Sequence, residues 1–340
     1  MRHWKKVVVL GSACLILALL VLPFLSGGLG RAGEAVIRLK LISMYPKDAL
    51  WNTFPFKWME RVNKAAAGKV QISFIGGPEI VAPFEALGPV EKGTFDMVCG
   101  TPAFHTGKVP DGYFSAFNLA SLPEQRKAGV LKIVDKKYRE KANITLIGFC
   151  AGGTRLGMLT KKRVASFSDF KTFRIRTVPF FVPVVESLGA SPVSISIPET
   201  YSALEKGIVD GVWMPIDQTI YENGWYRVLK YVLLPTSRFV TTDYLMINAK
   251  RFDALPKEVQ DLFVETLKAM EPEIWDYYTK ATDGEINRAV KEGLETLQLP
   301  PDVAKEFLNR TFDAAWKNLA AKAPETAAEI SKLYPRQTPQ

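Results

Sequence analysis

The fold is decided by residues 148–215, which read GFCAGGTRLGMLTKKRVASFSDFKTFRIRTVPFFVPVVESLGASPVSISIPETYSALEKGIVDGVWMP. Arg155 and Arg176 lie in this stretch near the ends of strand-like runs, beside glycines or a proline. A buried guanidinium stays charged and offers a rigid fork of donors, so it needs an anionic partner. Few acids lie close by in the sequence, which leaves a bound carboxylate as a candidate partner. The alternative is that both arginines are surface charges or pair with distant acids.

Strand-like and helix-like runs alternate within this stretch and on both sides of it. The predicted strands cover residues 36–44, 70–75, 95–99, 144–150, 173–177, 192–197 and 209–214, and the predicted helices cover residues 51–67, 83–92, 125–142, 182–188 and 199–206. Such alternation is typical of right-handed βαβ units and a mostly parallel sheet. Because the second half repeats the order of the first, and 340 residues exceed the size of one core, the sequence predicts two similar α/β lobes.

The C-terminal part of the sequence is strongly helical. After a predicted strand at residues 244–248, a helical pattern runs from about Pro256 to Leu294. At 1.5 Å per residue, such a helix would span about 60 Å and bridge both lobes, although a break within it is equally compatible with the pattern. Pro300 and Pro301 end the pattern, and residues 302–333 predict one or two closing helices.

The N-terminus has the order of a secretory signal. Basic residues at positions 2, 5 and 6 precede an apolar run over residues 7–25, and small residues follow up to Ala35. We expect residues 1–32 to be a signal peptide, cleaved after Ala32 or Ala35, with an uncleaved membrane anchor as the alternative. Its removal takes away four basic residues and no acid, which lowers the net charge from +9 to +5. No block of like charges remains to form a nucleic-acid-binding arm.

Cofactor and catalytic motifs are poorly represented. Residues 28–33 match the dinucleotide pattern G-x-G-x-x-G by letter, but a signal precedes them and a strand rather than a helix follows, so we expect no cofactor. His105 is the one histidine beyond the signal, and we expect it to be structural or at a cleft rim. No metal is expected, because metal-ligand spacings and nucleophile motifs are missing. Cys99 and Cys150 end apolar runs, which leaves a disulfide and two buried free thiols equally open.

Several aromatic residues are candidates for a pocket wall or for the core. Trp213 is the strongest candidate for the pocket, because it ends an apolar strand next to Pro215, where a cleft between lobes would open. The others are Trp51, Phe54, Phe84, Phe180, Tyr201 and Trp225.

Several segments together resemble one family, the solute-binding proteins of tripartite ATP-independent periplasmic (TRAP) transporters, in the C4-dicarboxylate-binding group. The matching segments are GPEI at 77–80, FEAL at 84–87, EKGTFDM at 91–97, GTR at 153–155, FSDFKTFRIR at 167–176, LGASPV at 188–193 and ETYSALEKGIVDG at 199–211. The last is the most specific, since the family pattern reads roughly E-x-Y-x-A-L-x-x-G-x-V-D-G. Together the segments extend over most of the chain after the signal.

The resemblance implies a periplasmic receptor, not an enzyme, that closes two lobes over a small organic acid and delivers it to TRAP membrane subunits. It implies lobe I at residues 36–153 plus 243–285 and lobe II at 154–242 plus 286–335, bridged by a long helix. The family's principal carboxylate-binding arginine matches Arg176, and its second arginine matches Arg155. The candidate ligand-binding residues are Arg176, Arg155, Trp213, Met214, Glu79 and Phe180. We expect contact with a membrane only through the transporter or an uncleaved anchor.

The sequence departs from the family pattern after Gly211. Many members carry Q-E-N-P there, whereas this chain has V-W-M-P, with Trp213 in place of the glutamate and Met214 in place of the asparagine. An apolar wall beside one or two arginines predicts a monocarboxylate with a hydrophobic or aromatic body rather than a sugar acid or a compact dicarboxylate. Two other functions share the lobes: a secreted α/β enzyme acting on a small carboxylate, and a ligand sensor not coupled to transport. A cation beside the ligand is left open.

Overall fold

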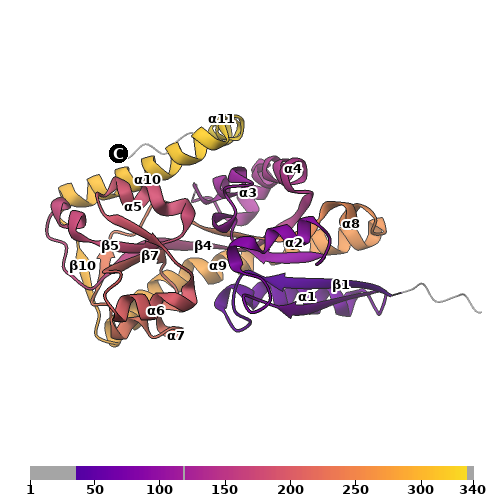
Figure 1. Ribbon diagram of the computed structural model, residues 1–340. Coiled ribbons are helices and arrows are strands. Elements are labelled where there is room, and N and C mark those ends of the chain that lie inside the picture. The colour runs from indigo at the N-terminus through magenta and orange to yellow at the C-terminus, as the bar shows by residue number, and fades with distance from the viewer. Residues whose placement is uncertain (1–35, 118, 335–340) are drawn as a thin grey trace, which may run out of the picture. The chain divides into compact units, whose positions relative to one another are not determined.

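A computed structural model describes residues 36–117 and 119–334 of the protein (Figure 1). The predicted signal peptide, residues 1–32, lies outside these residues. The described strands are β1 Ile37–Ser43, β2 Val70–Gly76, β3 Met97–Gly100, β4 Ile144–Thr160, β5 Arg174–Thr177, β6 Ser191–Ser194, β7 Gly211–Pro215, β8 Tyr231–Leu234, β9 Val240–Asn248 and β10 Glu295–Gln298.

Helices separate most of these strands, as the alternating pattern predicts. They are α1 Thr53–Ala65, α2 Leu87–Glu91, α3 Leu122–Ala128, α4 Val130–Ala142, α5 Val182–Ser187, α6 Ile197–Glu205, α7 Thr219–Glu222, α8 Ala249–Asp253, α9 Lys257–Lys291, α10 Pro301–Lys322 and α11 Pro324–Leu333. Short 3-10 helices include η1 Leu50–Asn52, η3 Pro102–Phe104, η4 Pro110–Phe117 and η6 Pro179–Phe181. Within the described ranges, every helix is too short or too polar to cross a membrane.

The strands fall into two groups that share β4. Along the sheet the order is β2-β1-β3-β9-β4-β7-β5-β6, and β8 and β10 join beside β4. Figure 1 shows β5, β7 and α6 in one group and β1, α1 and α2 in the other, with β4 passing between them. The outer strands pair in parallel, as in β1 with β2 and β5 with β6. The expectation of a mostly parallel sheet is wrong at the centre, where β4 pairs antiparallel with both β9 and β7.

The strand β4 is much longer than the sequence predicts. It runs for 17 residues, whereas the pattern indicates an end at Cys150. The glycines that suggest this end lie at a bulge, because the pairing with β9 shifts register between Gly152 and Arg155. Gly153 has a φ of +109°, and a Cβ there would meet the methyl group of Thr279 at 2.7 Å. Glycine is therefore required for the irregular backbone and for close packing on α9, and it does not end the strand.

The long helix α9 confirms the predicted C-terminal helix and is continuous. It has 35 residues, which gives a length of about 52 Å. Pro272 lies within it but does not break it, and Met270 and Ile274 on either side are fully buried. The helix packs along β4 and against α1. Two closing helices follow, α10 and α11, as the sequence predicts.

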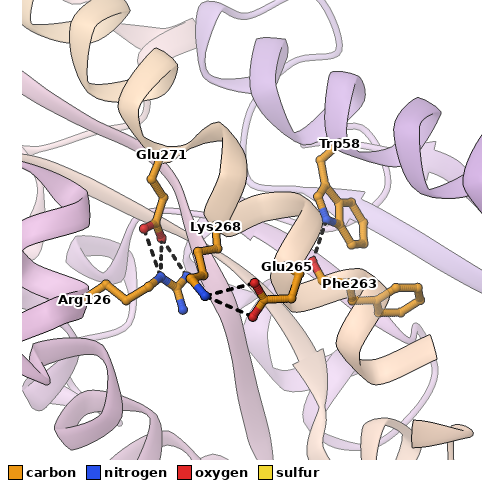
Figure 2. A network of polar contacts seen from close by, with 6 residues as sticks. All are labelled: Trp58, Arg126, Phe263, Glu265, Lys268 and Glu271. Atoms are coloured by element: carbon orange, nitrogen blue, oxygen red, sulfur yellow. Dashed lines mark hydrogen bonds and ion pairs between the residues drawn. The ribbon is translucent and has the colours of Figure 1, made fainter. Parts of the chain in front are cut away.

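Polar contacts hold α9 to helices on two sides (Figure 2). The indole nitrogen of Trp58 on α1 donates to the carbonyl of Phe263 at 3.0 Å. The guanidinium of Arg126 on α3 donates to both carboxylate oxygens of Glu271, through Nε at 2.8 and 2.9 Å. Because Glu271 is only 1% exposed, this bidentate pair satisfies a charge that would otherwise be costly to bury. These contacts therefore fix α9 to α1 through Trp58 and to α3 through Arg126.

Two hydrophobic clusters form the core. The larger one extends from β1 and α1 through β4 and α9 to α10. The smaller one gathers side chains of α6, β7, α7, β8 and the 3-10 helix η7 Trp225–Arg227, including Leu204, Met214 and Trp225. Trp225, one of the aromatic candidates for a pocket wall, is therefore a core residue.

Candidate functional site

Arg176 is positioned by a short parallel strand. Strand β5 lies between β6 and β7, and Arg176 pairs in register with Val193 on one side and Val212 on the other. Two residues earlier, Arg174 is fixed by Asp210: its backbone N–H and its Nε each donate to Oδ2 at 3.0 Å. Arg174 therefore anchors the strand, and Arg176 is left for another role.

The Arg176 side chain is buried, but no described carboxylate pairs with it. Its exposed fraction is 3%, and its Nε donates to the carbonyl of Ile195 at 3.0 Å. Burial lowers the pKa of the guanidinium to about 10, with the charge of Glu199 opposing this shift. The group therefore remains a cation at neutral pH. A buried cation without an acidic partner is costly, and a bound anion would compensate for that cost.

Arg176 lines a cavity of about 60 Å³ that receives side chains from both strand groups. From the strand group that contains β1, the segments after β1 and β3 contribute Tyr45, Trp51, Thr101 and Phe104, and β9 contributes Thr241 and Asp243. From the group that contains β5 and β7, the cavity receives Val178 and Phe181 after β5, Ile197 at the start of α6, and the end of β7. The predicted meeting of Arg176, Trp213 and Met214 at one place is found in this cavity.

The end of β7 supplies an apolar wall. Trp213 and Met214 are 1% and 3% exposed, and the Trp213 ring lies 6.2 Å from the ring of Phe181 and 6.1 Å from that of Phe239. Gly211 sets the start of this wall, because a Cβ there would meet the carbonyl oxygen of Leu159 at 2.4 Å. The wall can pack against the hydrocarbon part of a solute.

Two buried acids that sequence reasoning missed also line the cavity. The hydroxyl of Tyr45 donates to Asp243 Oδ2 at 2.8 Å, and burial raises the pKa of this carboxyl to about 7. The backbone N–H of Thr219 donates to Asp217 Oδ1 at 2.7 Å, and burial raises the pKa of Asp217 to about 7 as well. Asp217 is 0% exposed, and its Oδ2 has no hydrogen-bond partner among the described residues.

The other three candidate residues do not line this cavity. Arg155 is paired with Asp283 of α9 and its side chain is 40% exposed. Glu79 is exposed, and its Oε1 accepts from the backbone N–H of Gly77 at 2.7 Å. Phe180 is fully buried against Tyr113, with ring centroids 4.2 Å apart, so its neighbour Phe181 takes the place at the cavity.

The described histidine and the two described cysteines are buried outside the cavity. His105 is buried, its Nε2 lies 2.6 Å from the hydroxyl of Tyr138, and burial lowers its pKa to about 3. Cys99 and Cys150 are free, and burial raises the pKa of the Cys99 thiol to about 12. The described ranges contain no group of three or more histidines, cysteines and acids that could hold a metal ion.

Comparison with known proteins identifies the family and the fold. The family model for bacterial extracellular solute-binding proteins, family 7, matches residues 45–323. A monocarboxylate 2-oxoacid-binding periplasmic protein of Nostoc is 24% identical over 313 residues, which cover 86% of this chain and 82% of that relative. Two other curated relatives are matched over only 43% and 41% of their own length.

Solved structures share the same fold. The chain resembles DctP7 of Bordetella pertussis, an extracytoplasmic solute receptor binding pyroglutamic acid, with a TM-score of 0.78 and 19% identity over 88% of this chain and all of that one. It also resembles a TRAP periplasmic solute-binding protein of Desulfovibrio salexigens with bound orotic acid, with a TM-score of 0.76 and 19% identity over 88% and 97% of the two chains.

These matches confirm the resemblance to TRAP solute-binding proteins and the predicted two-lobed α/β fold. They also place the protein among receptors rather than among enzymes. The chain belongs to family 7 of the bacterial extracellular solute-binding proteins.

Proposed function

We propose that this protein binds a small organic monocarboxylate through Arg176 in the periplasm and delivers it to the membrane subunits of a TRAP transporter. The observation that carries the proposal is a buried guanidinium that lines a cavity and has no acidic partner among the described residues. By contrast, Arg126 and Arg174, which share its chemistry, are both satisfied by acids within the chain.

A carboxylate suits the hydrogen bonds that Arg176 has left. Its Nε is used by Ile195, which leaves the two terminal nitrogens for a solute. Two parallel N–H···O bonds from a guanidinium fix both the position and the orientation of a carboxylate. Because the surroundings are buried, the charge attraction is stronger there than in water.

The rest of the cavity favours an apolar or aromatic solute body. Trp213, Met214 and Phe181 line it, and a second arginine is not among the lining residues that the structure describes. One cationic group matches one carboxylate, so a monocarboxylate is preferred over a dicarboxylate. Relatives with the same fold support an organic acid in general, since one is described as binding monocarboxylate 2-oxoacids, another pyroglutamic acid and others L-galactonate or beta-D-galacturonate. The narrower class rests on the lining of the cavity.

Closure of two lobes would bring the cavity walls together. We propose lobe I at residues 36–153 plus 243–285 and lobe II at 154–242 plus 286–335, because the lining residues divide between these parts. The hinge would lie where β4 and β9 pass from one lobe to the other, near Gly153 and Thr242, because the pairing of the two strands is irregular there. A solute that contacts both lobes binds the closed form better and shifts the population toward it.

The test is a thermal-shift screen of organic acids with Arg176→Ala and a matched control. We expect a monocarboxylate to stabilise the wild type, and Arg176→Ala to abolish this stabilisation, because losing one partner of a buried charge pair costs about 2–5 kcal/mol of binding. Arg310→Ala is the control, since Arg310 is half-exposed and pairs with Glu306 on α10.

Retention of the ligand-induced shift in Arg176→Ala would contradict the proposal. Arg155→Ala is the informative second variant, because Arg155 remains a predicted ligand residue although it pairs with Asp283. We expect it to keep most of the shift. Stabilisation by dicarboxylates or sugar acids alone would contradict the proposed solute class.

A further inference from the structure

Three polar atoms on residues that line the cavity are buried without a hydrogen-bond partner. They are Nε1 of Trp213, Oγ1 of Thr241 and Oδ2 of Asp217. A buried polar atom left unsatisfied costs about 1–3 kcal/mol, so three of them around one cavity indicate that something else supplies the partners. Arg176 pairs with none of them, and as a donor it could not satisfy the indole N–H of Trp213.

Asp217 is the most informative of the three. Among the described residues, it is the only carboxylate with such an atom, and it is 0% exposed. Its other oxygen is held by the backbone N–H of Thr219 at 2.7 Å, which fixes the carboxyl group at the start of α7. An oriented carboxylate of this kind offers one acceptor to whatever occupies the cavity.

The second acid in the cavity differs from Asp217 in this respect. Asp243 accepts from the Tyr45 hydroxyl at 2.8 Å, and neither of its oxygens is among the described buried atoms without a partner. Protein groups therefore satisfy Asp243, whereas Asp217 keeps an open position. The difference assigns the two acids different roles, with Asp243 stabilising the cavity wall.

We infer that Asp217 accepts a hydrogen bond from an N–H or O–H group on the solute whose carboxylate Arg176 holds. This inference rests on the proposed function and narrows its solute class to monocarboxylates that also carry a hydrogen-bond donor. The side chains of Trp213 and Met214 would then cover the apolar part between or beside these two polar ends. A site built to pair with a donor discriminates strongly against an analogue without it, because the protein's acceptor is left unpaired.

Isosteric solute pairs test the inference directly. Pyrrole-2-carboxylate and furan-2-carboxylate differ by an N–H against an oxygen in the same ring position, and L-lactate and 2-fluoropropionate differ by a hydroxyl against a fluorine. Dissociation constants would be measured by titration calorimetry with the whole purified protein at about pH 8.5, above the pKa of about 7 that burial gives Asp217. We expect the donor-bearing member of a pair to bind about 10- to 100-fold more tightly.

Variants separate this role from a structural one. Asp217→Asn keeps the shape but weakens the acceptor, so the preference ratio within a pair should fall toward one, a change that general destabilisation would not produce. Asp276→Asn is the control, because Asp276 is exposed and pairs with Lys280 on α9, away from the predicted ligand residues. The wild-type comparison alone remains decisive if Asp217→Asn does not fold.

The outcomes distinguish this inference from the proposed function. Equal binding within both pairs, or tighter binding of the furan and fluoro compounds, would overturn the role of Asp217 while leaving Arg176 as the carboxylate anchor. Binding of no member of either pair, or undiminished binding to Arg176→Ala, would overturn the proposed function itself.

Discussion

At the scale of single residues, two arginines of one strand differ in whether an acid within the chain pairs with them. Arg174 and Arg176 lie on the same short strand, but Asp210 neutralises only the first. Glu199, the acid whose charge Arg176 senses, is exposed and engaged elsewhere, because its Oε2 accepts from the backbone N–H of Ser196 at 3.0 Å. Arg176 therefore keeps an uncompensated charge beside an apolar wall, which is the property expected of an anion receptor.

Asp217 gives a prediction about stability and pH. Burial raises its native pKa to about 7, with the charge of Glu222 adding to the shift. An unfolded aspartate has a pKa of about 3.9. Between about pH 4 and 7 the unfolded state therefore binds fewer protons than the native state, so a rise in pH favours unfolding by up to about 1.4 kcal/mol per pH unit. Above about pH 7 both states are ionised and this contribution stays constant.

Asp217→Asn removes this one contribution. Asp243 and Glu285 also have pKa values raised to about 7, and burial, the largest cause for both, is the same in the two proteins. The charge of Asp217 is a smaller cause for both groups, so its removal lowers their pKa values and adds to the gain in stability. Urea unfolding of the ligand-free proteins should therefore show the variant gaining stability relative to the wild type across pH 4–7. Parallel stability curves over that range would show that Asp217 does not titrate as described.

Sequence reasoning found the apolar and cationic parts of the cavity but missed its acids. Trp213 and Met214 follow a recognisable motif, and Arg176 lies at the end of a predicted strand. Asp217 lies in a polar loop sequence, and Asp243 follows two threonines just before the predicted strand at 244–248, so neither has a periodicity that signals burial. Their burial depends on long-range pairing of β9 with β4 and on packing of α7, which a local pattern cannot reveal.

At the scale of elements, the most specific sequence motif builds the support for the site. Residues 199–211 form α6 and the turn into β7. Glu199 completes the capping box of this helix, Asp210 receives Arg174 and Lys162, and Gly211 permits the close approach to β4. None of residues 199–211 lines the cavity, whereas Trp213, Met214 and Pro215, just beyond the motif, do. The motif therefore fixes where β5 and β7 lie, and the variable positions after it determine the wall.

Asp210→Asn tests this division of roles. Burial opposes ionisation of Asp210, but hydrogen bonds from Arg174 and Lys162 outweigh it and lower its pKa. Weakening these charged hydrogen bonds should cost about 1.5–3 kcal/mol of folding stability and also weaken solute binding through displacement of β5. Glu306→Gln, at the exposed pair with Arg310, should cost no more than about 1 kcal/mol.

Chemical denaturation and calorimetry of the two variants give both quantities. Full stability of Asp210→Asn would contradict the anchoring role of Arg174.

The sequence predicted this segment well because its helix cap, glycine stop and strand are local signals. It predicted β4 poorly, because the bulge at Gly152 and Gly153 depends on pairing with a strand about 90 residues later.

At the scale of the whole molecule, the described residues combine a shared strand, a spanning helix and a cavity lined from both strand groups. The antiparallel pairing of β4 with β9 gives two connections between the groups, and the paired contacts of Trp58 and Arg126 hold α9 behind them. On the proposed division into lobes, this frame would open and close about β4 and β9. We therefore expect solute binding, not chemistry, to drive the change between states.

A crystal structure of the protein with a bound monocarboxylate would show whether Arg176 holds the carboxylate of the solute. We expect both carboxylate oxygens within about 3 Å of the terminal nitrogens of Arg176, with the solute body against Trp213 and Met214. A carboxylate bound at Arg155 or elsewhere, with the Arg176 terminal nitrogens unpaired, would contradict it.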